Sequence, residues 1–144
     1  MLACENLLIV LWKQTPDAAT CRVVYELGER TAKGHPTGKV SVVSLLRGKF
    51  SAPPTSARQA LEDLYEDPGR IVHRVAIILP HTGFVAATVR SIVLSATQRS
   101  ARRQGHGVFS ILAKGVSWAL EGLPTATGSP LSVPELVGAL EKIE

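Results

Sequence analysis

Cysteine is scarce in this chain of 144 residues, and the two cysteines, Cys4 and Cys21, stand in no paired or metal-binding spacing. A disulfide scaffold needs a denser set, and a structural zinc site needs CxxC or paired cysteine and histidine motifs. We therefore expect a reducing compartment, with both cysteines acting as small buried hydrophobic residues. The four histidines show no spacing of the HExxH type, so the sequence predicts no metal site.

Charge and long hydrophobic runs are also limited. Only 19% of the residues are charged and the net charge is +4, which excludes a polyanion-binding tail and only mildly favours acidic partners. The arginines of "QRSARRQGHG" have no interleaved aromatic residues, so nucleic acid is not favoured as a partner. The longest apolar segment is interrupted by Arg90, and no secretory leader is recognisable. We expect a cytoplasmic protein that does not engage a membrane.

Catalytic and cofactor motifs are missing as well. The sequence has no GxSxG elbow, and its glycine-rich stretch "RTAKGHPTGK" lacks the GxxxxGK[ST] spacing of a phosphate loop. The acidic residues of "LEDLYED" are those of a solvated helix face. We therefore predict no catalytic residue and no cofactor, and if the chain were an enzyme, His81 would be the first candidate for a titrating group.

Strand and helix patterns alternate along the chain. Strands are predicted at 7–12, 39–46, 73–80 and 107–113, and helices from a Thr15 cap to a stop at Gly34, then at 55–67, 82 to about 104, 115–123 and 133–143. Residues 1–6 can add an antiparallel edge strand through a turn at Glu5 and Asn6. This order predicts an α/β fold with a mostly parallel sheet of four to five strands, flanking helices and one appended C-terminal helix.

Helical periodicity predicts which faces are buried. In the first helix the inward face is predicted to comprise Thr20, Val23, Val24, Leu27 and Thr31. In the long third helix the side chains predicted to face the sheet are Val85, Val89, Ile92, Val93 and Ala96, which turns Phe84, Ala87 and Leu94 toward the other side. Such an outward apolar strip can receive a partner or a second copy, or it can be covered by the appended C-terminal helix. Ser132 and Glu135 form the pattern of a capping box for the last helix.

The succession of "NLLIVLW", a helix, "KVSVVSLL", a proline-bounded helix, "VAIILPHTGF" and a long alanine-rich helix resembles the STAS-like group. These are relatives of the sulfate transporter and anti-sigma-factor antagonist domains, among them bacterial single-domain proteins. The resemblance covers about residues 5–123 of a predicted domain of residues 1–123, and it implies a non-catalytic regulatory or scaffolding module in signalling. Residues 124–144 are a linker and a helix that packs on its own domain or on a neighbouring chain, as in a homodimer.

The resemblance also points to one junction. In STAS antagonists the third strand enters a helix through Asp-Ser-Ser-Gly and an apolar residue, and the serine before the glycine is phosphorylated. The matching residues here are Pro80, His81, Thr82, Gly83 and Phe84. The resemblance makes Thr82 the phosphoacceptor position and His81 to Phe84 a partner surface, although the aspartate is replaced by Pro80 and the first serine by His81.

The same junction is favoured by topology. Parallel strands end at one edge of a sheet, where α/β proteins usually bind ligands and where helix N-termini attract anions. The residues expected there with anion-binding side chains are Lys13, Lys49, His81, Thr82 and Lys114. We predict a protein-partner surface, with a carrier domain for a small molecule or anion as the alternative. A third interpretation remains open, in which Thr82 is only a helix cap and the lysines are ordinary surface charges.

Overall fold

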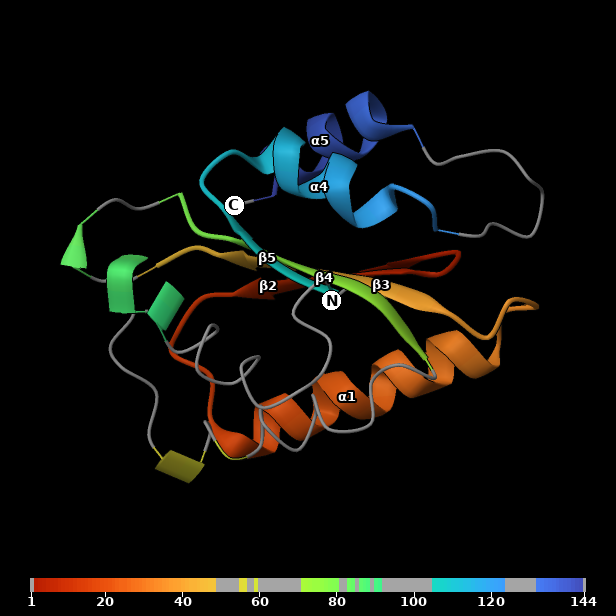
Figure 1. Cartoon of the computed structure of the whole chain (residues 1–144), viewed down its shortest axis with the longest axis horizontal. Helices are drawn as coiled ribbons and strands as arrows, with labels where there is room; N and C mark the ends of the chain where they lie inside the picture. Colours follow the sequence, from red (N-terminus) through yellow and green to blue (C-terminus); the bar gives the residue numbers. More distant parts are fainter. Residues whose placement is uncertain are drawn as a thin grey trace.

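The computed structural model describes residues 2–48, 55–56, 59, 71–80, 83–84, 86–88, 90–91, 105–123 and 132–143. Its centre is a five-stranded sheet with the order β1-β2-β3-β4-β5 (Figure 1). The strands are β1 (Leu2–Cys4), β2 (Leu7–Trp12), β3 (Val40–Leu46), β4 (Val72–Ile78) and β5 (His106–Phe109). Strands β2 to β5 are parallel, and β1 pairs with β2 in the antiparallel sense. The predicted α/β class, the mostly parallel sheet and the N-terminal edge strand are confirmed.

Both faces of the sheet are covered by helices, which explains the nearly continuous apolar runs of the central strands. Alternate residues of each strand point to opposite faces. Leu8, Val10 and Ile77 belong to the core on one face, whereas Leu7 and Ile78 belong to the core on the other. In Figure 1, α1 lies below the sheet, and α4 and α5 lie above it. The architecture therefore has three layers, with the sheet in the middle.

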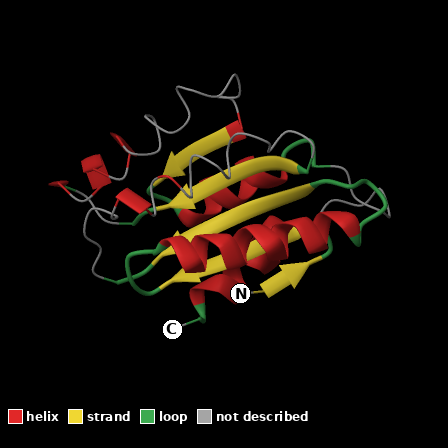
Figure 2. Cartoon of the chain, turned by 90° about the horizontal axis from the view of Figure 1, so that it is seen from below, coloured by secondary structure: helices red, strands yellow, loops and turns green. Residues whose placement is uncertain are grey.

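Helix α1 (Ala18–Lys33) covers the lower face, and Figure 2 shows it lying along the strands. The predicted cap at Thr15 is wrong, because Asp17 is the N-cap and its carboxylate accepts from the Thr20 backbone N–H at 2.7 Å. The predicted inward face is also wrong in part. Thr20 is exposed and Val23 is 50% exposed, while the buried residues are the small ones, Cys21, Gly28 and Ala32. Small side chains let the helix approach the sheet closely.

Helix α4 (Leu112–Leu120) lies on the upper face, and Gly115 allows it to come close to β4. A Cβ atom at Gly115 would overlap Ile78 Cδ1 and would lie 3.3 Å from the Phe109 ring. The predicted strand 107–113 is too long, since β5 ends at Phe109 and Ile111 already serves as the N-cap of α4. The predicted helix 115–123 correspondingly begins too late. The chain turns between these elements within two residues.

Helix α5 (Val133–Glu141) packs beside α4 on the upper face. Leu140 is 2% exposed and joins the upper core, and Val133, Leu136 and Val137 pack against that core. The C-terminal helix therefore docks on its own chain. Ser132 stands at the N-cap position without a side-chain hydrogen bond to the helix, so the predicted capping box is not formed.

The third predicted helix is represented by its described positions between 84 and 91, all of which are helical. Ala86 is 3% exposed and belongs to the lower core, whereas Phe84 and Ala87 are exposed. The predicted outward side of this helix is thus confirmed at Phe84 and Ala87. Within the described part of the chain, none of the helices combines the length and the apolar character needed to cross a bilayer.

Candidate functional site

The four parallel strands end at one side of the sheet, which we call the carboxyl edge. The side where they begin is the amino edge. At the carboxyl edge the ends of β2 and β3 are pinned together, because the Arg47 backbone N–H donates to the Trp12 carbonyl at 2.8 Å. Gly48 has a φ of +134°, and a Cβ atom there would lie 2.5 Å from the Lys13 carbonyl oxygen. This contact admits only glycine, and it leaves the Lys13 side chain exposed beside the junction.

The end of β4 carries the junction that the sequence singles out. Leu79 is 1% exposed and its backbone N–H donates to the Phe109 carbonyl at 2.8 Å, which ties β4 to β5 up to the edge. Gly83 has a φ of +95°, and a Cβ atom there would meet nothing within 4 Å, so the backbone conformation alone explains this glycine. Its carbonyl accepts from Ala87 N–H at 3.1 Å and starts the helix.

Phe84, the next residue, is 87% exposed. Its backbone carbonyl accepts a hydrogen bond from the Thr88 hydroxyl at 2.9 Å, which anchors the backbone while the ring stays in solvent. Burying a phenylalanine side chain is worth about 1.5–3 kcal/mol relative to leaving it exposed, so an aromatic ring this exposed in the free chain is a ready contact for a partner. The predicted site residues Gly83, Phe84 and Ala87 therefore lie at an accessible place.

The end of β5 adds an aliphatic side chain and a cation. Ile111, two residues after β5, is 50% exposed, and Lys114 in the first turn of α4 is exposed. Sequence reasoning missed Ile111 because it placed this residue inside a strand. Lys13 and Lys114 are thus both exposed at the carboxyl edge, at the ends of β2 and after β5, as the topology argument predicted.

Arg47 connects the carboxyl edge to the C-terminal helix. Its guanidinium donates to the Leu140 carbonyl at 3.0 Å and also to the Ile143 carbonyl. These are carbonyls at the end of α5, where the helix leaves acceptors without intrahelical partners and where a cation is favourable. The end of α5 is thereby held at the carboxyl edge, which places Ile143, 37% exposed, on the same side as Phe84 and Ile111.

Four of the predicted site residues, Lys49, His81, Thr82 and Leu94, lie outside the described residues. Their roles in anion binding, in capping the helix and in partner contact stay predictions, as does Thr82 as a phosphoacceptor. The structure thus places Lys13, Gly83, Phe84, Ala87 and Lys114.

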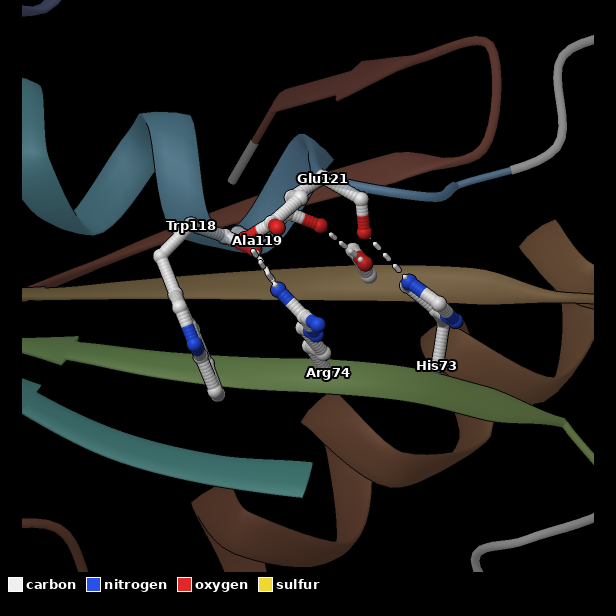
Figure 3. Close-up of polar contacts among 6 residues, drawn as sticks. His73, Arg74, Trp118, Ala119 and Glu121 are labelled. Atoms are coloured by element: carbon white, nitrogen blue, oxygen red, sulfur yellow. Dashed lines mark hydrogen bonds and ion pairs between the residues drawn. The ribbon is translucent and has the colours of Figure 1, made fainter. Parts of the chain in front are cut away.

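A second group of polar side chains lies at the amino edge, and it closes that edge (Figure 3). The Arg74 guanidinium donates to the Trp118 carbonyl at 2.7 Å and to a Glu121 carboxylate oxygen at 3.0 Å. His73 Nε2 lies 2.9 Å from the Glu121 carbonyl oxygen. Together they hold the last turn of α4 over the beginning of β4.

Ser41 of β3 also contacts α4 at the amino edge. Its side chain is fully buried, and its hydroxyl donates to the Ala119 carbonyl at 2.7 Å. Arg74 also lies over the Trp118 ring, with Cζ 4.8 Å from the centroid, and Trp118 contacts Phe109 with centroids 5.3 Å apart. Sequence reasoning did not find this group. The available signal was the polar pair His73 and Arg74 at the start of an otherwise apolar strand.

Two titratable groups have perturbed pKa values. Hydrogen bonds from the Thr20 hydroxyl and backbone N–H lower the pKa of Asp17, so this capping carboxylate stays ionised at neutral pH. Burial raises the pKa of the Cys21 thiol, and the nearby Asp17 carboxylate raises it further, which favours the protonated thiol of an inert core cysteine. Among the described residues no group of three or more histidine, cysteine, aspartate or glutamate side chains could hold a metal ion.

Comparisons with known proteins found no matching family model, no matching curated protein and no matching solved structure.

Proposed function

We propose that this chain is a STAS-like, non-catalytic regulatory or scaffolding module that binds a protein partner through the carboxyl edge of its sheet. The described part of the element order supports this assignment, because α1 lies between β2 and β3, helical residues follow β4 and α4 follows β5. The surface is proposed to include Gly83, Phe84 and Ala87, and also His81, Thr82 and Leu94.

The observation that carries the proposal is the exposure of Phe84. At 87% it is the most exposed of the large hydrophobic residues in the described part of the chain. It follows a tightly tied strand end and a glycine whose positive φ sets the start of the helix. A solvated aromatic ring that follows a hydrogen-bonded strand end is available as a binding anchor.

The anion-carrier alternative requires converging polar groups inside an enclosed pocket. Lys13 and Lys114, the described members of the predicted anion set, are exposed instead. Their placement supports a surface for a macromolecule better than a pocket for a small ion.

The test is affinity capture from the native cell extract with wild-type chain and with Phe84→Ala, followed by mass spectrometry. Val23→Ala is a matched control, because Val23 is a half-exposed apolar residue on α1. Both substitutions are expected to change the free energy of unfolding by less than about 0.5 kcal/mol, as for exposed sites generally. We expect a partner that wild type and Val23→Ala retain and Phe84→Ala loses. Identical capture by all three chains would contradict the proposal.

A further inference from the structure

Exposed apolar side chains gather at the carboxyl edge. The exposed large hydrophobic residues among those described are Val23, Phe84, Ile111 and Ile143. Phe84 follows the end of β4, Ile111 follows the end of β5, and Ile143 is held beside the end of β3 by Arg47. All but Val23 therefore lie at one edge, from three separate parts of the chain.

Exposed lysines lie at the same edge as these side chains. Lys13, Lys114 and Lys142 are exposed at the same edge, and none of the three forms an ion pair within the described residues. The carboxylates described at this edge are Asp17, already engaged by Thr20, and Glu141. At the amino edge, by contrast, ion pairs occur: Lys33 with Glu29 at 3.9 Å and Arg74 with Glu121 at 3.0 Å.

We propose that the occupant of the carboxyl edge is an acidic amphipathic segment of another protein. This inference rests on the proposed function and specifies the chemistry of the partner. Apolar side chains of the segment cover Phe84, Ile111 and Ile143, and its carboxylates pair with the lysines at this edge. Complementary charge around an apolar centre steers the encounter and selects among partners.

Two other classes of partner fit the edge less well. Single-stranded nucleic acid is held by stacking of bases on aromatic side chains, whereas Ile111 and Ile143 are aliphatic and offer no stacking surface. An anionic membrane is recognised by clusters of about 4–8 cations, and Asp17 and Glu141 would face such a surface unfavourably. A protein segment can supply both apolar cover and individually placed carboxylates.

The test uses two displayed peptide libraries of about 16 residues with the apolar spacing of an amphipathic helix. One library carries aspartate and glutamate at the polar positions, and the other carries lysine and arginine. The full chain selects from both, and enriched peptides are measured by fluorescence anisotropy with wild type, Phe84→Ala and the double variant Lys13→Glu/Lys114→Glu. The matched control, Arg22→Glu/Arg30→Glu, makes the same change in net charge on the exposed side of α1.

We expect enrichment from the acidic library alone. The affinity should fall about tenfold or more in Lys13→Glu/Lys114→Glu and in Phe84→Ala, change less than about twofold in the α1 control, and weaken as salt is raised. Circular dichroism and thermal unfolding verify that each variant keeps the fold.

The contrary outcomes separate this inference from the proposed function. If Phe84→Ala abolishes peptide binding but the lysine reversal does not, or if the basic library is enriched equally, the acidic segment is wrong while the partner surface stands. If enriched peptides bind Phe84→Ala as well as wild type, both ideas fail. Enrichment from neither library, or binding to phosphatidylserine vesicles that the lysine reversal removes, overturns the acidic-segment inference in favour of another partner class.

Discussion

The two edges of the sheet differ in whether their side chains have partners within the described part of the chain. At the amino edge, Ser41, His73 and Arg74 contact the last carbonyls of α4, and the cation of Arg74 is matched by Glu121. At the carboxyl edge, Phe84 and Ile111 are exposed, and Lys13 and Lys114 make no ion pair within the described residues.

This difference separates stabilising contacts from contacts that are available to a partner. The last carbonyls of a helix need hydrogen-bond donors when they lie over a sheet, and the amino edge supplies them. Stability offers no comparable reason for a phenylalanine that is 87% exposed. Substitutions at the amino edge should therefore change stability, and substitutions at the carboxyl edge should change binding.

The largest expected effect on stability comes from a substitution that pushes α4 away from the sheet. This helix runs from one edge to the other. Gly115→Ala places a methyl group against Ile78, and overpacking of this kind costs about 1–3 kcal/mol of unfolding free energy. Gly138→Ala in α5 is the control, because its Cβ meets nothing within 4 Å and both substitutions share the gain in helix propensity of about 1 kcal/mol. Urea unfolding followed by tryptophan fluorescence compares the two. A Gly115→Ala chain as stable as Gly138→Ala would refute the close seating of α4.

An effect of similar size is expected from opening the amino edge alone. Arg74→Ala removes hydrogen bonds to the Trp118 carbonyl and to Glu121, and a hydrogen bond to a charged group is worth about 1.5–3 kcal/mol. Glu121→Gln should cost less than about 0.5 kcal/mol, because this carboxylate is 72% exposed. Both variants should keep Phe84-dependent capture. If a folded Arg74→Ala chain lost capture, partner binding at the carboxyl edge would depend on the contacts of the amino edge, against this prediction.

The smallest effect concerns the cap of α1 and depends on pH. Thr20 lowers the pKa of Asp17 in the folded chain, so the ionised carboxylate contributes stability that is present above the ordinary aspartate pKa of about 3.9. That contribution is lost as the pH falls through the lowered folded value. Wild type should have a higher thermal midpoint than Asp17→Asn at pH 7. The difference should shrink as the pH is lowered below the ordinary aspartate pKa of about 3.9. A difference that is constant with pH would contradict this assignment.

The sequence predicts most of the sheet because its strands are short apolar runs bounded by polar residues. The predicted strands agree with the structure for β2 and β3. Helical periodicity also predicts the outward positions of Phe84 and Ala87. It fails after Phe109, because Ile111 continues the apolar run although it caps α4 without a polar side chain. It fails on α1 because the buried residues of this helix, Cys21, Gly28 and Ala32, are small and carry little hydrophobic signal.

The two edges of the sheet also differ in how far the sequence predicts their polar residues. Lys13 and Lys114 could be placed at one edge because parallel topology brings strand ends together. The contacts of Arg74 with Trp118 and of Ser41 with Ala119 span 44 and 78 residues, and no local pattern encodes their geometry. The role of Arg47 at the end of α5 likewise depends on where the C-terminal helix docks, which periodicity alone leaves open.

The most direct test of the carboxyl edge is photo-crosslinking in the native extract from a benzoylphenylalanine placed at position 84, compared with the same group at position 121. Both positions are exposed, and they represent the two edges. We predict a discrete protein adduct from position 84 and none from position 121. An adduct from position 121 alone, or the absence of any specific adduct from position 84, would contradict the assignment of the carboxyl edge as the partner surface.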